Sequence, residues 1–289
     1  MKKKMALLLA AALTMTTILT GCGGGNEENA DKQSDVTAED AKEENASGDS
    51  VSEGGTVFTV GFDAEYPPYG YMDENGEYTG FDLELAQAVC DLEGWELVKK
   101  PINWDSKDME LNSGSIDCIW NGFTMNGRED DYTFSDSYVD NSQVIVVAED
   151  SGIDTLDALT GKVVGVQAAS AALELLQSEE EGGQKALADT FGSLNEFADY
   201  NTAFTELQAG ALDALAIDIG VAKYQIKSRG DGYKIVDETL NTEQYAVAFK
   251  KGNQELCDKI NADLQKLTDK YVKEVDKAVE SKSKEVMTV

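Results

Sequence analysis

The sequence contains no histidine in its 289 residues. This absence excludes mechanisms that pair a serine or cysteine nucleophile with a histidine base, and it excludes ordinary zinc sites. Basic residues are also scarce: 24 lysines and arginines stand against 55 aspartates and glutamates, so the net charge is −31. Because nucleic acid and anionic lipid repel so acidic a chain, we expect no nucleic-acid partner.

Cysteine is nearly as rare, with four residues in the chain. Apart from Cys22, the cysteines are Cys90, Cys118 and Cys257, and no two of them are close in sequence. Three thiols cannot all pair with one another, and Cys118 lies within an apolar strand pattern. We interpret these three as mostly buried thiols, with a disulfide as the alternative.

The first 22 residues have the pattern of an export signal. Three lysines precede an apolar stretch, residues 5–19, that is too short and wrongly flanked for a retained membrane span. The stretch ends in Leu19-Thr-Gly-Cys22, which resembles the lipobox of bacterial lipoproteins. We therefore expect an extracytoplasmic protein anchored to the cell membrane by lipidated Cys22. The alternative is ordinary secretory cleavage, with Cys22 incidental.

Residues 23–55 are rich in glycine, serine, asparagine, alanine and acidic residues, with almost no large apolar side chain. Such a segment cannot bury enough surface to offset the entropy lost on ordering, so we predict a disordered acidic tether. The remaining chain, about 230 residues, is long enough for one large core or two modest ones.

One pattern occurs twice in this remaining part. Residues 110–119 (ELNSGSIDCI) and 206–215 (ELQAGALDAL) each indicate the end of a helix, a glycine turn and a short apolar strand. In α/β sheets, ligands bind beyond the carboxyl ends of strands, so the residues after each copy are the first candidates for a binding site. They include Gly122 after the first copy and Asp218 after the second, which would face each other across a cleft between two similar lobes.

The other patterns alternate between strands and helices. In chain order they are strand 56–60, helix 81–89, strand 97–100, helix 105–112, strand 116–120, strand 144–147, strand 162–166, helix 170–177, helix 203–208, strand 212–217, helix 221–227, strand 245–249 and long helices over 255–282. This order predicts parallel, doubly wound α/β sheets.

We predict two lobes joined by two chain crossings. Lobe 1 is expected to comprise residues 56–143 and 247–289, and lobe 2 residues 144–246. The simpler alternative, two domains strictly in sequence, is less favoured because the C-terminal helices bring no sheet of their own. Ile260, Leu264 and Leu267 are expected on one helical face.

Five positions have the chemistry to hold a zwitterion. The guanidinium of Arg128 matches a carboxylate bidentately, and the helix that starts at Ser170 offers free N–H groups to the same anion, with the Thr124 hydroxyl as a further donor. Asp218 and the backbone carbonyl of Gly122 can accept from an ammonium. The alternatives are a surface ion pair for Arg128 and a plain helix cap for Ser170.

A longer set of motifs carries a family resemblance across nearly all of residues 56–249. The motifs are Asp63-x-x-Tyr66-x-Pro68-Tyr69, Gly80-Phe81-Asp82, Trp104-Asp105, Ser113-Gly-Ser-Ile-Asp117, Gly122-Phe-Thr124, Arg128 with Phe134-Ser135 and Tyr138, Val164-Gly-Val-Gln167, and Asp218-x-x-Val221-x-x-Tyr224. Together they resemble the polar amino-acid-binding proteins of ABC importers, the extracellular solute-binding proteins of family 3. That resemblance implies a two-lobe, periplasmic-binding-protein-like fold of type II with two crossover strands.

The resemblance also implies roles for individual residues. Arg128, Thr124 and the helix start at Ser170 would hold the ligand's α-carboxylate, and Asp218 with the Gly122 carbonyl would hold its α-ammonium. The ligand's side chain would lie between Tyr66 and Trp104, and its polar end would meet Asp63, Asn121 and Gln167.

The implied function is a lipid-anchored receptor that closes on a polar α-amino acid and delivers it to an ABC permease, without catalysis, metal or organic cofactor. Lysine or arginine, glutamine and cystine are the candidate ligands, and we expect a monomer. Two alternatives remain: a sensor domain for a separate signalling protein, and a dehydratase-like enzyme with a carboxylate such as Asp63 as general acid.

Overall fold

The computed structural model describes residues 55–230 and 232–287. The predicted signal segment with Cys22, and all but the last residue of the predicted tether, lie outside these described residues. Among the helices that are described, none has the length and apolar content needed to cross a membrane.

The first sheet has five strands in the order β5-β1-β6-β14-β7. They are β5 (Glu96–Pro101), β1 (Val57–Phe62), β6 (Cys118–Ile119), β14 (Ala248–Lys250) and β7 (Tyr132–Phe134). Strand β1 pairs in parallel with both β5 and β6, as the alternation of elements predicted. We call this sheet and the helices packed on it lobe 1.

Two helices and a small sheet complete the early part of lobe 1. Helix α1 (Phe81–Glu93) follows β1, and α2 (Lys107–Ser113) follows a 3₁₀ turn (Trp104–Ser106). Strands β2 (Glu65–Tyr66), β3 (Gly70–Met72) and β4 (Tyr78–Thr79) form a separate three-stranded sheet between β1 and α1 in sequence.

The second sheet is the base of lobe 2 and has the order β10-β9-β11-β8-β12, with β13 paired to β8. Its strands are β10 (Ser193–Phe197), β9 (Val163–Gln167), β11 (Ala214–Asp218), β8 (Val139–Ala148), β12 (Tyr233–Ile235) and β13 (Asn241–Tyr245). Its helices are α3 (Ala171–Gln177), α4 (Lys185–Ala188), α5 (Tyr200–Ala209) and α6 (Ile219–Arg229), with a 3₁₀ turn at Leu156–Leu159. In this lobe the sequence patterns missed β10, β12 and α4, which are short and only partly buried, and all of β13 but its last residue.

Both copies of the repeated sequence have the predicted structure. Each contains the end of a helix, a glycine in the left-handed conformation and a buried strand. The glycines are Gly114, with φ 77°, and Gly210, with φ 73°. A side chain other than glycine's would strain the backbone there, which explains why glycine ends both helices.

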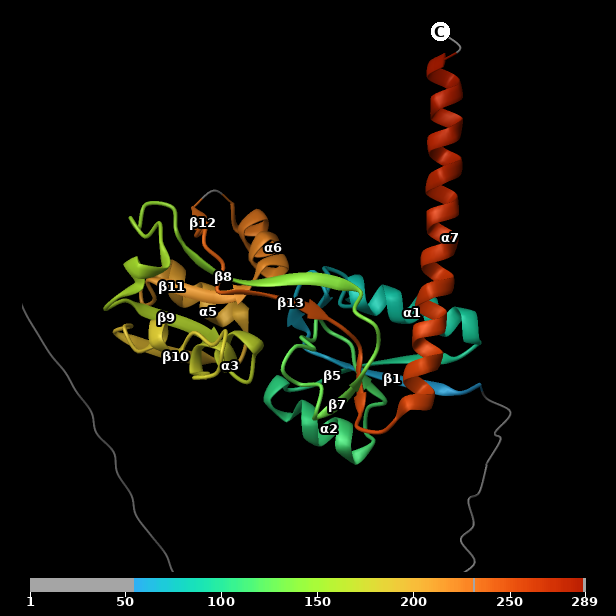
Figure 1. Ribbon diagram of the computed structural model, residues 1–289, viewed down its shortest axis with the longest axis horizontal. Coiled ribbons are helices and arrows are strands. Elements are labelled where there is room, and N and C mark those ends of the chain that lie inside the picture. The colour runs from blue at the N-terminus through green and yellow to red at the C-terminus, as the bar shows by residue number, and fades with distance from the viewer. Residues whose placement is uncertain (1–54, 231, 288–289) are drawn as a thin grey trace, which may run out of the picture. The chain divides into compact units, whose positions relative to one another are not determined.

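The chain passes between the two sheets along β8 and β13, which run antiparallel from Val139 opposite Tyr245 to Gln143 opposite Asn241 (Figure 1). The prediction of one strand over residues 245–249 is wrong. Tyr245 ends β13 opposite Val139 of β8, whereas Ala248 pairs with Ile119 in the lobe 1 sheet. The apolar run is therefore divided between two sheets, because each of its halves is buried in a different core.

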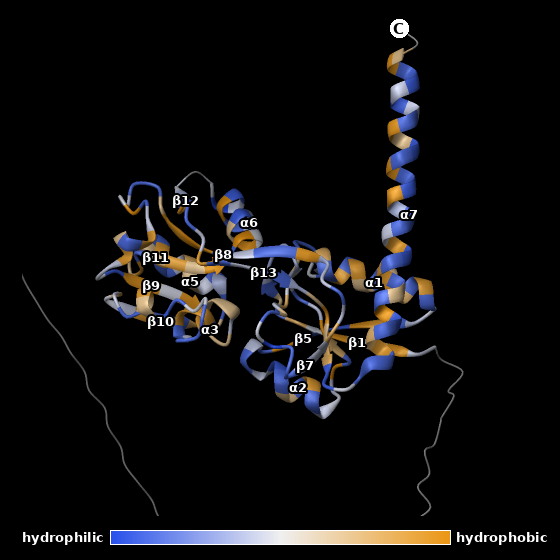
Figure 2. Ribbon diagram, viewed as in Figure 1, coloured by the Kyte–Doolittle hydropathy of each residue, from blue (hydrophilic) through white to orange (hydrophobic). Residues whose placement is uncertain are grey.

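A single helix, α7 (Gln254–Met287), replaces the several C-terminal helices that we expected. No proline or glycine interrupts this segment, so nothing in it forces the helix to break. Its first part packs against lobe 1 through Cys257, Ile260 and Leu267, with Leu264 partly buried beside them. The predicted shared face is confirmed. Figure 2 shows apolar and polar residues alternating along the whole helix.

The three described cysteines, Cys90, Cys118 and Cys257, are all buried and free. This result agrees with the interpretation as buried thiols rather than with the disulfide alternative.

A glycine at the start of α1 provides a test of this fold. Gly80 has φ 132° and ψ 164°, a conformation open essentially to glycine alone, and an added Cβ would lie 2.3 Å from the Tyr69 carbonyl oxygen. We expect Gly80→Ala to lower the free energy of unfolding by about 3 kcal/mol or more, measured by urea denaturation. Gly76→Ala is the matched control, since Gly76 also has positive φ but no atom within 4 Å of the added Cβ. Its expected cost is about 1–2 kcal/mol, and equal losses would contradict the steric argument.

Candidate functional site

Residues from both lobes surround one small cavity, with a volume of about 20 Å³. The lining residues are Tyr66, Trp104, Gly122, Phe123, Thr124, Arg128, Gln167, Ser170, Ala171 and Asp218. Eight of the ten residues that the sequence predicted as ligand-binding are among them. Of the other two, Asp63 accepts a hydrogen bond from the lining residue Gln167, and Asn121 accepts one from the Asp63 N–H.

Arg128 is buried, with 7% of its surface exposed, and its guanidinium lies 4.7 Å from the centre of the Phe123 ring. Its Nε donates to the Glu174 carboxylate at 3.0 Å, and its Nη2 lies 2.8 Å from the same oxygen. Glu174 belongs to the first turn of α3, so this ion pair joins the two lobes. The cationic group therefore already binds a carboxylate, and that carboxylate comes from the protein itself.

Asp218 ends β11 and is 4% exposed. Its Oδ1 accepts hydrogen bonds from Asn141 Nδ2 at 2.7 Å, Gln143 Nε2 at 2.6 Å and the Tyr245 hydroxyl at 2.6 Å. Three neutral donors thus stabilise a buried acidic group that has no cationic partner among them. The carboxylate remains suited to a cation that enters the cavity.

A second buried acid, Glu243, was not predicted from the sequence. Its Oε1 accepts from Asn141 and Gln143, the same two amides that bind Asp218, and from the Thr124 hydroxyl at 2.7 Å. Burial raises the pKa of Glu243, and the nearby charge of Asp218 raises that pKa further. The Thr124 hydroxyl, expected to bind a ligand carboxylate, is engaged with this glutamate in the structure.

The signal that could have identified Asn141 and Gln143 is a local one. Asn141 and Gln143 lie two residues apart in β8, just before its apolar segment. Glu243 of β13 pairs directly with Asn141. Alternation with period two places such side chains on one face. Only the pairing of two strands that are 100 residues apart brings Glu243 to the same face.

Behind the cavity, a chain of hydrogen bonds links the lobes. Gln167 Nε2 donates to Asp63 Oδ2 at 2.7 Å, and Asn121 Oδ1 accepts from the Asp63 backbone N–H at 2.9 Å. Burial raises the pKa of Asp63, while hydrogen bonds from the Glu65 backbone and Gln167 oppose the rise. Gln167 and Asn121 thus each bond to Asp63, and of these three residues only Gln167 lines the cavity.

Backbone geometry shapes the rest of the lining. Gly122 has φ 56°, and an added Cβ would lie 2.9 Å from the Tyr245 ring and 3.1 Å from the Tyr66 ring. Ser170 caps α3 by accepting from the Leu173 N–H at 3.1 Å, so its helix-cap role is confirmed. Lys107 donates to the Ala169 carbonyl at 3.2 Å and adds a third contact between the lobes.

The two aromatic candidates differ in surroundings. Tyr66 is buried, and its hydroxyl shares a hydrogen bond of 3.2 Å with the hydroxyl of Tyr245. Trp104 is partly buried and packs edge to face with Phe123, the ring that also lies under Arg128. Both side chains line the cavity, so an apolar part of a ligand would meet aromatic surface there.

Asp82 connects the site to the fold. It is fully buried in α1, and its Oδ2 accepts from the Gly122 N–H at 2.5 Å, which fixes the Asn121–Gly122 peptide beside the cavity. Burial raises the pKa of Asp82 to about 7, although the hydrogen bond from Gly122 opposes the rise.

This raised pKa predicts a pH dependence of stability. An unfolded aspartate titrates near pH 4, so between about pH 4 and 7 the folded chain binds a proton that the unfolded chain does not. The free energy of unfolding should therefore decrease as pH rises through this window. Asp82→Asn does not titrate there. Between about pH 4.5 and pH 7.5 we therefore expect its free energy of unfolding, measured by urea titration, to fall by a few kcal/mol less than that of wild type. Asp91→Asn, an exposed change on the same helix, should follow wild type; parallel pH curves for Asp82→Asn would refute the assignment.

Known proteins resemble this chain along most of its length. The family model for bacterial extracellular solute-binding proteins, family 3, matches residues 58–278. The chain is 32% identical over 274 residues to the arginine-binding extracellular protein ArtP of Bacillus subtilis (strain 168), covering 93% of this chain and 94% of ArtP. It is 31% identical over 222 residues to the L-cystine-binding protein TcyJ of Escherichia coli (strain K12), covering 75% of this chain and 80% of TcyJ.

A solved structure gives the same comparison in three dimensions. The crystal structure of an ABC uptake transporter substrate binding protein from Streptococcus pneumoniae with bound histidine has a TM-score of 0.68 and 34% identity. The match covers 73% of this chain and 87% of that one.

Proposed function

This chain belongs to the bacterial extracellular solute-binding proteins of family 3, and from that premise we propose that it binds a polar α-amino acid between its two lobes and delivers it to an ABC permease. The observation that carries the proposal is the shared cavity of Arg128, from lobe 1, and Asp218, from lobe 2. A guanidinium and a carboxylate on opposite walls match the two charges of a zwitterion.

The energetics favour an α-amino acid over a singly charged ligand. Both walls are buried, so a ligand that left either group unpaired would incur a desolvation cost of several kcal/mol. The Gly122 carbonyl adds an acceptor near Asp218, and the N–H groups at the start of α3 add donors near Arg128. Micromolar affinity corresponds to about −8 kcal/mol, which a few charge-assisted hydrogen bonds and two aromatic contacts can supply.

The acidic groups favour a ligand whose side chain is cationic or rich in donors. Asp63, Asp218 and Glu243 are all buried at or behind the cavity. The relatives that share this fold bind arginine, cystine and histidine. A thermal-shift screen against the common amino acids and cystine would identify the ligand, because one that binds only the folded chain raises its melting temperature.

The proposal includes extracytoplasmic location and a lipid anchor on Cys22, for which the lipobox-like Leu19-Thr-Gly-Cys22 is the support. It excludes catalysis: the ligand should be recovered unchanged after prolonged incubation, whereas conversion would favour the dehydratase-like alternative.

Arg128→Ala tests the central assignment. Truncating one partner of a buried charge pair costs about 2–5 kcal/mol, so we expect affinity to fall by about 100-fold or more in isothermal titration calorimetry with the ligand from the screen. Arg229→Ala is a matched control, because Arg229 also lies over a ring, that of Phe204 at 5.1 Å, but lines no part of the cavity. Retained affinity in Arg128→Ala would remove the proposed carboxylate site.

Glu174 supplies a second test of the same site. Its carboxylate binds Arg128 in the structure, so a ligand carboxylate must replace it. Glu174 is more than half exposed, and such a pair contributes about 0.2–1 kcal/mol. We therefore expect Glu174→Gln to bind the ligand about two- to fivefold more tightly, with Glu179→Gln, a similar change just beyond α3, as the control. Weaker binding would show that Glu174 supports the ligand-bound form instead.

A further inference from the structure

Asp218 and Glu243 form a pair of buried acids that share their hydrogen-bond donors. Asn141 Nδ2 lies 2.7 Å from Asp218 Oδ1 and also 2.7 Å from Glu243 Oε1. Gln143 Nε2 likewise lies 2.6 Å from the first oxygen and 2.8 Å from the second. Because the same two nitrogens contact both oxygens, the two carboxyl groups are close neighbours. Each acid is only 4% exposed.

This pair has no cationic neighbour that would neutralise it. Among the described residues, no ion pair joins a lysine or arginine to either acid. Glu243 also accepts from the Thr124 hydroxyl and from the Asn241 amide, both of which are neutral. Burial raises the pKa of the nearby Tyr200 hydroxyl of α5 well above its ordinary value, so that group stays neutral too. Two carboxylates so close in a dry site repel each other, so one of them keeps its proton to a higher pH than an isolated carboxyl group would.

The two shared amides indicate that the pair nonetheless carries negative charge. Both direct their N–H₂ groups at the acids, whereas their oxygens, Asn141 Oδ1 and Gln143 Oε1, are buried without a hydrogen-bond donor among the described residues. Buried acceptors without donors cost free energy. This orientation is favourable only when the acids attract the donors strongly, as an ionised carboxylate does. At least one of the two acids is therefore ionised.

Glu243 is the acid that holds the proton. Burial raises its pKa above the ordinary value of 4.5, and the charge of Asp218 raises that pKa further, while hydrogen bonds from three neutral side chains oppose the rise. Its Oε2 accepts only the long hydrogen bond from Asn241 Nδ2, at 3.3 Å, among the described residues. This less strongly bonded oxygen is the natural position for the proton.

A second pocket, which we call the outer pocket, gives Glu243 a route to solvent. It has a volume of about 510 Å³ and is lined chiefly by residues 140–142 of β8 and 242–244 of β13. It shares no lining residue with the amino-acid cavity. Asp218 thus lines the cavity, whereas Glu243 lines the outer pocket. A proton can therefore leave Glu243 while the cavity is closed around a ligand.

We propose that a ligand's ammonium group, on meeting Asp218, expels the proton that Glu243 holds, so that amino-acid binding is coupled to proton release. The inference rests on the proposed function, which brings the ammonium to Asp218. The ammonium offsets the charge that opposed ionisation of Glu243. The Glu243 O–H bond then breaks, and the proton passes to water through the outer pocket. Glu243 is a positioning residue, because it does not line the cavity and acts through Asp218.

This coupling has a definite sign. Where the unliganded chain binds more protons than the complex, the affinity for the ligand rises with pH. That range begins near the ordinary glutamate value of 4.5 and extends upward through the raised pKa of Glu243. At higher pH Glu243 is ionised with and without ligand, so the coupling no longer changes the affinity. There the pair presents two negative charges to the ammonium instead of one.

Isothermal titration calorimetry with the ligand from the screen, at about pH 4.5 and pH 7.5, tests the coupling on wild type and Glu243→Gln. Glutamine has nearly the shape of the protonated acid and cannot ionise. We expect the two chains to bind within about threefold of each other at the lower pH, and wild type to bind about tenfold more tightly at the higher pH. Asp63, Asp82 and the ligand itself titrate in both chains, so their effects cancel in this ratio.

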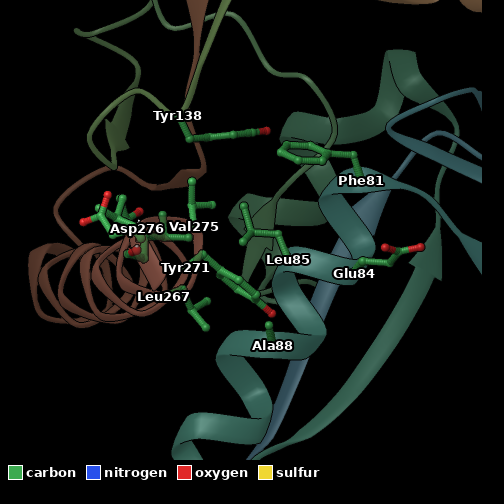
Figure 3. Close-up of a pocket in the computed structure, with 12 residues that line it drawn as sticks. Phe81, Glu84, Leu85, Ala88, Tyr138, Leu267, Tyr271, Val275 and Asp276 are labelled. Carbon is green, nitrogen blue, oxygen red and sulfur yellow. Dashed lines mark hydrogen bonds between the residues drawn. The ribbon is translucent and has the colours of Figure 1, made fainter. Parts of the chain in front are cut away.

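Glu84→Gln is the matched control. Glu84 is exposed on α1 and lines an open groove between α1 and α7, which shares no lining residue with the cavity or with the outer pocket (Figure 3). The same chemical change there should leave the affinity within about twofold of wild type at both pH values.

A second measurement needs no variant. Titrations of wild type at about pH 5.5, in two buffers of different ionisation enthalpy, give the number of protons released on binding. We expect a clear fraction of a proton, up to about one, to be released. Glu243→Gln should release less, provided that circular dichroism and the melting temperature without ligand show that this variant is folded.

Two results would overturn the coupling. If wild type released no proton, Glu243 would hold none that the ligand displaces. If Glu243→Gln were weaker by the same factor at both pH values, the role of Glu243 would be structural. A chain that binds no amino acid would refute the proposed function and this inference together. Binding that is lost in Arg128→Ala but releases no proton in wild type would refute the coupling alone.

Discussion

The arrangement of the cleft depends on how the carboxylate of Asp218 is stabilised away from water. A buried acidic group without partners costs several kcal/mol, and here the partners are two side-chain amides and a phenol rather than a cation. Neutral donors stabilise the acid without neutralising it. The wall that Asp218 forms therefore keeps its attraction for a positive group that enters the cavity.

Those donors come from the strands that connect the lobes. Asn141 and Gln143 belong to β8, and Tyr245 is the last residue of β13. Glu243 lies two residues before Tyr245. It accepts hydrogen bonds from the same two amides and from the Thr124 hydroxyl of lobe 1. The polar network of the site is therefore built into the crossing itself, so a movement of one lobe relative to the other would act directly on the groups that hold Asp218.

The opposite wall follows a different principle. Arg128 lies on the Phe123 ring, and its charge is balanced by Glu174 across the cavity. Because Glu174 is largely exposed, its hydration offsets part of the loss when another carboxylate takes its position. One wall thus holds a permanent neutral scaffold around an acid, and the other holds a cation with a replaceable partner. A zwitterion satisfies both walls at once.

The apolar periodicity of helix α7 continues beyond the part of the helix that is buried against lobe 1. Up to Leu267 the pattern is buried against lobe 1, and beyond Thr268 the same periodicity continues without any covering element among the described residues. The periodicity alone does not distinguish these two parts. The two parts differ because the helix is longer than the surface of lobe 1 on which it packs.

Sequence patterns by themselves determined most of the helices and strands of the two α/β units and the paired helix–glycine–strand repeats, and residue chemistry together with the family resemblance identified most of the residues around the cavity. These features depend on local periodicity, on glycine's access to positive φ and on the chemistry of residues such as Arg128 and Asp218 at strand ends. Only the tertiary structure decided that residues 245–249 divide between two sheets, that Glu243 joins Asp218, and that Thr124 and Arg128 already have acidic partners. Each of these depends on contacts between residues far apart in the chain, for which local pattern carries no information.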